Sequence, residues 1–141
     1  MLLQLNLYKE NGTFLFKQTD SLSAVCNAPN NCSGIYLIYA VINGKRDLIY
    51  VGISGRKTKD GTIKHRKDGL KGRFLTGKTD NILRKIAWPN RMMTQNINEL
   101  EIAWYVTYGL HNQDFPRELE IEILTQYLNE KGRLPIWNKR I

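Results

Sequence analysis

Residues 34–52 read GIYLIYAVINGKRDLIYVG and contain the clearest structural signal in the chain. Two apolar runs, rich in β-branched and aromatic residues, flank an Asn-Gly-Lys-Arg turn at residues 43–46. Such runs favour strands, and Asn-Gly between them favours a tight turn, so the stretch predicts an antiparallel hairpin. Tyr36 and Tyr50 then lie near its open end, within one or two residue pairs of each other. The neighbouring glycines, Gly34 and Gly52, leave room for a backbone or a substrate.

The rest of the chain predicts an α+β domain with a small, mainly antiparallel central sheet flanked by helices. Alternating leucines between residues 3 and 7, then Asn11-Gly12 and two phenylalanines, predict an extra N-terminal β-hairpin. Residues 18–33 read as a connecting segment. We therefore expect one domain over 1–141, in which 1–32 form the hairpin and connection and 33–141 form the core.

Beyond residue 52 the pattern alternates between polar and helical segments. Residues 54–68 have little apolar content and predict a long basic loop. A short helix is expected over 70–77, and another over 81–88 with Asp80 as its N-cap and Pro89 at its end. A strand is expected over 100–109. Pro116 and Gly132 bound a predicted helix over 116–131.

Positive charge is concentrated in one segment. The 141 residues include 21 Lys and Arg against 13 Asp and Glu, for a formal charge of +8. Between residues 45 and 91 there are 14 basic and 4 acidic residues, whereas the remainder is nearly balanced. This asymmetry predicts a surface that follows a phosphate backbone. The candidate DNA-binding residues are Arg56, Lys57, Lys59, Lys64, Arg66, Lys67, Lys71 and Lys78.

Several classes of protein are disfavoured by composition. No stretch approaches the roughly 18 consecutive apolar residues of a membrane span, so no membrane partner is expected. The N-terminus lacks the pattern of a signal peptide, which favours a cytoplasmic location. Cys26 and Cys32 are too few for a zinc quartet or a disulfide framework.

Glu120 is the candidate metal ligand. On a helical wheel of residues 116–131 it falls within an apolar stripe, while Glu118 and Glu122 point away. A carboxylate on a buried face needs a partner, and either an arginine or a hard divalent cation satisfies that need. The stripe consists of Leu124, Leu128, Ile121 and Tyr127.

Arg73 is the candidate phosphate ligand. Leu70 and Phe74 flank it on the predicted short helix, so its guanidinium is anchored and suits bidentate contact with a phosphate. A surface position on a basic face is the alternative. The two tyrosines are either core residues or phenols at a site, where a phenol of lowered pKa serves as a general base. Together, a base, a carboxylate and an arginine on a basic protein indicate phosphodiester hydrolysis.

The paired triplets Gly34-Ile35-Tyr36 and Tyr50-Val51-Gly52 resemble the signature of the GIY-YIG nuclease superfamily. This superfamily includes the N-terminal domain of the bacterial excinuclease C subunit and several homing and restriction endonucleases. The resemblance covers roughly residues 33–138. It implies a small antiparallel sheet flanked by helices, and DNA cleavage with one divalent metal ion held by a helix glutamate.

The resemblance also implies roles for individual residues. Tyr36 matches the tyrosine that activates the attacking water as general base, and Tyr50 matches the one that supports the water network or the phosphate. Arg73 matches the arginine of the helix after the second triplet. Glu120 matches the metal ligand, and Asn138 matches the asparagine that closes the motif and orients the site.

The chain departs from the family pattern in three places. The gap between the triplets is longer than usual. An insertion precedes Arg73, so Arg66 or Arg56 remains an alternative match for the phosphate-binding arginine. Gly77 stands where many members have a histidine, and His65 in the basic loop is a candidate to take its place.

These observations predict an endonuclease that hydrolyses DNA with one Mg²⁺ or Mn²⁺ ion, with a homodimer as the simplest way to cut both strands. Two alternatives stay open. One is a nucleic-acid-binding module that keeps the fold and has lost turnover. The other is a domain whose basic face serves RNA or a protein partner.

Overall fold

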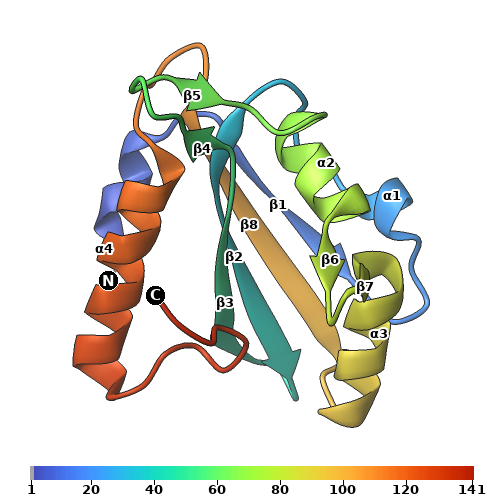
Figure 1. Cartoon of the computed structure of the whole chain (residues 1–141). Coiled ribbons are helices and arrows are strands. Elements are labelled where there is room, and N and C mark those ends of the chain that lie inside the picture. The colour runs from blue at the N-terminus through green and yellow to red at the C-terminus, as the bar shows by residue number, and fades with distance from the viewer. Residues whose placement is uncertain (1) are drawn as a thin grey trace.

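A four-stranded antiparallel sheet lies between helices in the computed structural model, which describes residues 2–141. Its strand order is β1-β8-β2-β3, and the α+β class with helices flanking a central antiparallel sheet is confirmed (Figure 1). The elements are η1 Leu3–Leu7, β1 Asn11–Phe16, α1 Leu22–Val25, β2 Ser33–Ile42, β3 Lys45–Ser54, β4 Arg56–Lys57, β5 Ile63–Lys64, α2 Gly69–Thr76, β6 Lys78–Thr79, β7 Ile82–Leu83, α3 Arg84–Thr94, β8 Glu99–Tyr108 and α4 Pro116–Lys131.

The predicted hairpin of residues 34–52 is confirmed as β2 and β3. Asn43 and Gly44 both have positive φ and form its turn, which is the backbone conformation that Asn-Gly favours. Tyr36 pairs with Gly52, and Ile38 pairs with Tyr50. The two tyrosines therefore sit two positions apart along the ladder, on the same face of the sheet.

The predicted N-terminal hairpin is wrong. Residues 3–7 form a 3-10 helix, and Asn11, where a turn was expected, begins a strand that pairs with the distant β8. Leu3 and Leu7 are exposed while Leu5 is buried, so the alternation of leucines did not mark one buried face. Long-range pairing with β8 takes the place of the local hairpin.

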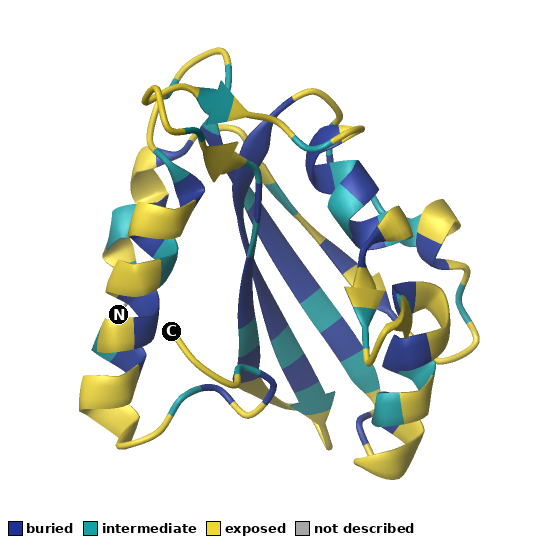
Figure 2. Cartoon of the chain, viewed as in Figure 1, coloured by how far each residue is buried: buried dark blue, intermediate teal, exposed yellow. Residues whose placement is uncertain are grey.

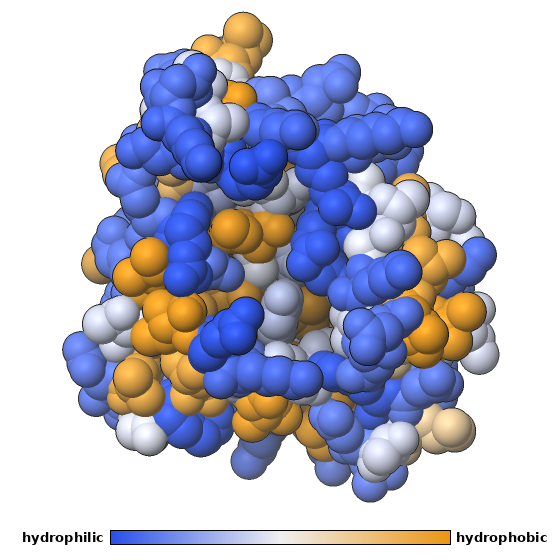
Figure 3. Space-filling model, in the orientation of Figure 1, coloured by the Kyte–Doolittle hydropathy of each residue, from blue (hydrophilic) through white to orange (hydrophobic). Residues whose placement is uncertain are grey.

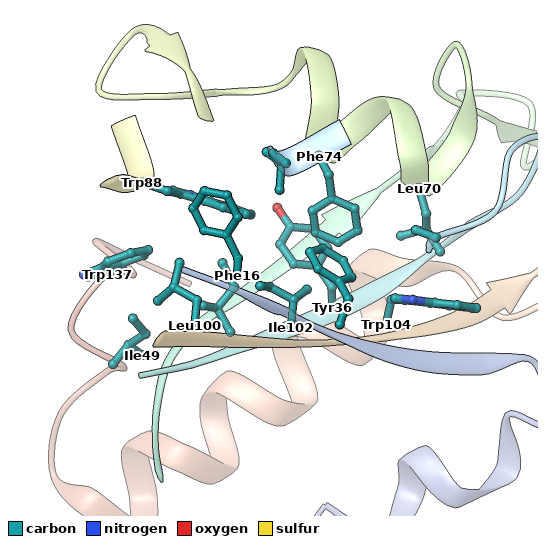
Figure 4. Packing of buried hydrophobic residues seen from close by; sticks show 14 of the residues in the cluster. Phe16, Tyr36, Ile49, Leu70, Phe74, Trp88, Leu100, Ile102, Trp104 and Trp137 are labelled. Carbon is teal, nitrogen blue, oxygen red and sulfur yellow. The ribbon is translucent and has the colours of Figure 1, made fainter. Parts of the chain in front are cut away.

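Each face of the sheet has its own core (Figure 2). Ile35, Leu37 and Val51 pack against α4 on one face. Tyr36 and its neighbours pack on the other face, which α1, α2 and α3 cover (Figure 1). Successive residues of β2 therefore alternate between the two cores. The labelled side chains of this second core are shown in Figure 4: Phe16, Tyr36, Ile49, Leu70, Phe74, Trp88, Leu100, Ile102, Trp104 and Trp137.

The helix before Pro89 differs from the prediction. It runs over Arg84–Thr94 and continues through Pro89, because buried Ala87, Trp88 and Met92 anchor it on both sides of the proline. Asp80 is not its N-cap. Asp80 lies in the turn between β6 and β7, and its carboxylate accepts two hydrogen bonds from Arg91, at 2.9 and 2.7 Å.

Two other segments complete the fold. The predicted basic loop contains a short ribbon of β4 and β5, and residues 116–131 form α4 as expected, ending at Gly132 with φ 74°. Gly132 adopts the left-handed conformation that glycine tolerates best. Within residues 2–141 no helix is long and apolar enough to cross a membrane.

Candidate active site

Tyr36 lies at the centre of the candidate site. Its side chain is fully buried on β2, and its ring centroid lies 4.7 Å from that of Phe74 (Figure 4). The ring centroid of Tyr50 lies 6.0 Å away. Its hydroxyl oxygen is buried and has no hydrogen-bond partner within residues 2–141. Because buried polar atoms are nearly always hydrogen-bonded, this hydroxyl calls for a functional explanation.

Two guanidinium groups act on the Tyr36 hydroxyl. Arg84, at the start of α3, lies over the Tyr36 ring with 5.4 Å between its Cζ and the ring centroid, and Arg73 approaches from α2. Burial alone raises the pKa of Tyr36, but the positive charges of Arg84 and Arg73 outweigh burial and hold this pKa below its ordinary value. The two arginines thus favour the ionised form of this phenol.

Tyr50 behaves in the opposite way. The negative charge that Tyr36 can carry, followed by burial, raises the pKa of Tyr50 to about 12. Gly52 explains how the two phenols fit together, because a Cβ at this position would clash with the end of the Tyr36 side chain and with the Tyr50 ring. The glycine of the second triplet therefore makes room for the tyrosine pair.

A groove of about 570 Å³ lies at β3, the edge strand of the sheet. It opens between α4 and the β6–β7 side of the molecule, and Figure 3 shows it as a hollow with hydrophilic residues along much of its rim. Tyr50 and Arg84 line the groove, whereas Tyr36, which both of them contact, does not. The lining residues whose side chains carry charge are Lys78, Asp80, Arg84, Arg91, Arg117, Glu120, Lys139 and Arg140.

Glu120 reaches this groove from α4. Its side chain is 13% exposed, and its Oε1 accepts a hydrogen bond from Arg117 at 2.6 Å. The predicted stripe around it was partly wrong, because Ile121 and Leu128 are exposed, but Leu124 and Tyr127 are buried. Arginine pairing and cation binding were the alternatives for this carboxylate, and it is paired with Arg117.

A metal ion at Glu120 would have one protein ligand. Within residues 2–141 no group of three or more His, Cys, Asp or Glu side chains could hold a metal ion. Mg²⁺ commonly keeps several waters and binds through one or two carboxylates together with substrate phosphates. A single half-buried carboxylate at the wall of an open groove fits that mode, with Arg117 as the group that would have to share it.

Asn138 joins the site by pairing with the sheet edge. Its side-chain oxygen accepts a hydrogen bond from the Val51 amide at 2.9 Å, and its side-chain nitrogen donates to the Val51 carbonyl at 3.0 Å. The Trp137 amide also donates to the Ile49 carbonyl. The chain after α4 is thereby fixed beside Tyr50.

Among the three candidate arginines, Arg73 is the one that lies beside Tyr36. Arg66 donates a hydrogen bond to Thr76 at 3.1 Å, and Arg56 is exposed on the ribbon. All three line a second cavity of about 340 Å³, which shares no lining residue with the groove. The three positions were not distinguishable in sequence, because the insertion obscured the spacing.

His65 lines the second cavity together with Arg73. Its Nδ1 lies 2.7 Å from the Ser33 hydroxyl, and its ring packs near Tyr108. The structure does not bring His65 into the groove that contains Tyr50 and Glu120.

The predicted DNA-binding residues divide between the two cavities and the ribbon. Lys78 lines the groove, while Lys64 and Lys67 line the second cavity. Lys57 is exposed, and its ammonium lies 4.7 Å from the centroid of the Phe115 ring, so it holds the ribbon against the start of α4. Lys59 is exposed, and Lys71 is half-buried on α2.

Arg84 is the functional candidate that sequence reasoning missed. It lies in a basic stretch and resembles a solvated helix residue when read along the chain. A helical wheel of α3 would have indicated that Arg84 is buried, because it falls one turn before Trp88 and on the same side as Ala87. Its full burial depends on the packing of α3 against α2 and the sheet, which the local sequence does not specify.

Comparison with family models, with curated proteins and with solved structures gives no match for the chain. The case for a site therefore rests on the geometry and chemistry of these residues.

Proposed function

We propose that this protein is a divalent-metal-dependent endonuclease that hydrolyses phosphodiester bonds in DNA. The observation that supports it most is the buried Tyr36 hydroxyl, which has no hydrogen-bond partner within residues 2–141 and lies under the influence of Arg73 and Arg84. Tyr50 and Arg84 extend this cluster into a basic groove that also contains Glu120. The double triplet, with its resemblance to GIY-YIG nucleases, points to the same chemistry.

In this proposal Tyr36 accepts a proton from the attacking water. The water oxygen forms a bond to phosphorus, the bond from phosphorus to the leaving oxygen breaks, and the leaving oxygen takes a proton from solvent water. Tyr36 suits the role because its pKa is lowered, while Tyr50, with a pKa of about 12, keeps its proton and can donate a hydrogen bond in the groove. Tyr36 needs access to the groove, and movement of Arg84 from its ring would provide it.

Glu120 would hold the Mg²⁺ or Mn²⁺ ion, with water completing the coordination. Bound there, the ion would neutralise charge that develops on the phosphoryl group. Arg117 contacts the same carboxylate and would keep it in position until the ion binds. The positive charge of Arg73 keeps the Tyr36 phenolate stable during the reaction.

The basic segment supplies affinity for the DNA backbone. Exposed lysines on and near the β4–β5 ribbon would contact phosphates without reading sequence. One groove provides one site for one strand. A homodimer would place a second site on the opposite strand.

The proposal is tested by plasmid nicking at low salt, with and without Mg²⁺, for the wild type and Glu120→Gln. Glu118→Gln is the matched control, because Glu118 lies exposed on the same helix, two residues away. We expect Glu120→Gln to lose about a hundredfold or more in rate, since metal catalysis contributes several kcal/mol. Glu118→Gln should cut like the wild type. Equal cutting by Glu120→Gln would reject Glu120 as the metal ligand.

A second function, DNA binding without turnover, is favoured by two observations. Tyr36 is closed off from the groove, and a residue other than histidine, Gly77, stands one turn after Arg73. Folded wild-type protein that binds duplex DNA but does not nick it with Mg²⁺ or Mn²⁺ would support this function and reject the nuclease. Tighter binding of RNA or of an acidic protein than of duplex DNA, compared across salt concentrations, would reject both.

A further inference from the structure

Arg84 is the one charged side chain that is fully buried within residues 2–141, with 1% of its surface exposed. It forms no ion pair there. Its Nη1 donates one hydrogen bond, at 3.5 Å, to the Arg73 carbonyl, and its Nε has no partner in the described part of the chain. A buried charge without a partner is costly, so a guanidinium in this state indicates a missing anion.

The surroundings of Arg84 do not supply that anion. Among the described residues that line the groove there are two carboxylate side chains, and both are engaged, Asp80 with Arg91 and Glu120 with Arg117. Ile141 also lines the groove, and its backbone carboxylate forms no ion pair with Arg84. Tyr36 is an acidic group against which Arg84 packs, and it is neutral while it holds its proton. Three further groove residues carry positive charge and form no ion pair with any residue from 2 to 141: Lys78, Lys139 and Arg140.

The amino end of α3 adds to this positive field. Arg84 is the first residue of this 11-residue helix, and the residue before it, Leu83, provides no side-chain cap. The first backbone N–H groups of a helix have no partners within the helix, and this end of the helix dipole is positive. Helix amino ends bind phosphate for both reasons.

We propose that Arg84 and the amino end of α3 bind a phosphate group of the nucleic-acid backbone in the groove, a role that rests on the proposed function. Arg84 lines the groove with Tyr50 and Glu120, whereas Arg73 lines the second cavity and directs its charge at Tyr36 and Tyr50. The two arginines therefore have different roles. Arg84 contacts the substrate phosphate, while Arg73 stays beside Tyr36.

Titration with inorganic phosphate in the absence of metal tests the site independently of cleavage. In the wild type, the Nε–H resonance of Arg84 should shift with saturation. Arg84→Gln should lower phosphate affinity by about tenfold or more, which is the effect of removing one charge-assisted hydrogen bond. Lys85→Gln is the control, because it removes the same charge from the exposed neighbouring position and should change affinity by less than about twofold.

A short DNA oligonucleotide without terminal phosphates separates a backbone phosphate from a free one. Its affinity should fall in Arg84→Gln and recover partly in Arg84→Lys, which keeps the charge but not the guanidinium fork. If only inorganic phosphate responds to Arg84, the backbone site is rejected. If Arg84→Gln does not fold, an unchanged Arg84 resonance in the wild type would equally reject the proposal.

The two proposals fail separately. If nicking depends on Glu120 but Arg84→Gln binds phosphate as tightly as the wild type, the Arg84 site is rejected and the nuclease proposal is supported. If phosphate binds at Arg84 but the protein does not nick DNA, the Arg84 site is supported and the nuclease proposal is rejected.

Discussion

The protonation of Tyr36 depends on burial and on the two guanidinium groups beside it. Burial raises its pKa, and Arg84 and Arg73 lower it further than burial raises it. In a near-ultraviolet absorbance titration, one tyrosine should therefore ionise before the others. Tyr36→Phe should remove this early step, and Arg84→Gln should move it to higher pH.

Stability should follow the same titration. Between the lowered pKa of Tyr36 and the ordinary tyrosine value, the unfolded chain binds the proton that the folded chain has released. The free energy of unfolding therefore rises with pH across this window, and Tyr36→Phe should lack that rise. Tyr39→Phe is the control, since burial raises the pKa of Tyr39. An early ionisation that survives in Tyr36→Phe would contradict the assignment.

At the scale of single residues, the sequence was sufficient to predict which side chains lie together when they belong to the same local element. Tyr36 and Tyr50 could be paired because both lie in one hairpin whose turn is marked by Asn43 and Gly44. Arg84 could not be found in this way. Its neighbours Tyr36 and Arg73 come from other elements, and only the packing of α3 brings them together.

Among the elements, the β4–β5 ribbon departs most from the expected loop. Asp60 in its turn accepts hydrogen bonds from the hydroxyls of Thr58 and Thr62 and from the Thr62 amide. Gly61 provides the positive φ of 87° that the turn requires. A loop was expected here because the segment has few apolar residues. These polar interactions, and not apolar packing, order the turn of the ribbon.

Asp60→Ala should weaken binding of duplex DNA, although it removes a negative charge from a basic segment. The reason is that the turn loses its hydrogen bonds and the ribbon lysines lose their fixed positions. Faster amide hydrogen exchange at Thr62 and a fluorescence-anisotropy titration measure the two effects. Asp47→Ala is the control, because Asp47 is exposed on β3 and forms no side-chain hydrogen bond or ion pair within residues 2–141. Tighter binding by Asp60→Ala would show that net charge matters more than order.

Elements with strong boundary signals were predicted well, and those with a long-range cause were not. The helix over 116–131 has Pro116 in its first turn and Gly132 after its end, and both bounds are confirmed. Residues 3–7 had only an alternation of leucines. Strand β1 forms because it pairs with β8, which lies far along the chain, as the register of Asn11 with Tyr105 shows, so no local pattern could reveal it.

On the scale of the whole molecule, the candidate site forms where the two cores meet at the edge of the sheet. Tyr50 comes from β3, Glu120 from α4 and Arg84 from α3, while Asn138 fixes the final segment to β3. The two helices cover opposite faces of the sheet (Figure 1). The edge strand is thus a place where residues from both faces can line a common groove.

The uneven distribution of positive charge predicts where on the molecule duplex DNA binds. Replacing exposed Lys59, Lys64 and Lys67 by glutamine should weaken binding of duplex DNA and flatten its salt dependence. For each DNA phosphate that the variant no longer neutralises, the slope of log affinity against log salt should fall by about 0.9.

The matched control replaces Lys9, Lys17 and Lys131, which are also exposed and lie outside the basic segment. Because both variants have the same net charge, an equal weakening in the control would mean that total charge, and not the ribbon surface, holds the DNA. Weakening confined to the first variant would place the backbone along the ribbon and the second cavity, from which Arg73 leads to Tyr36.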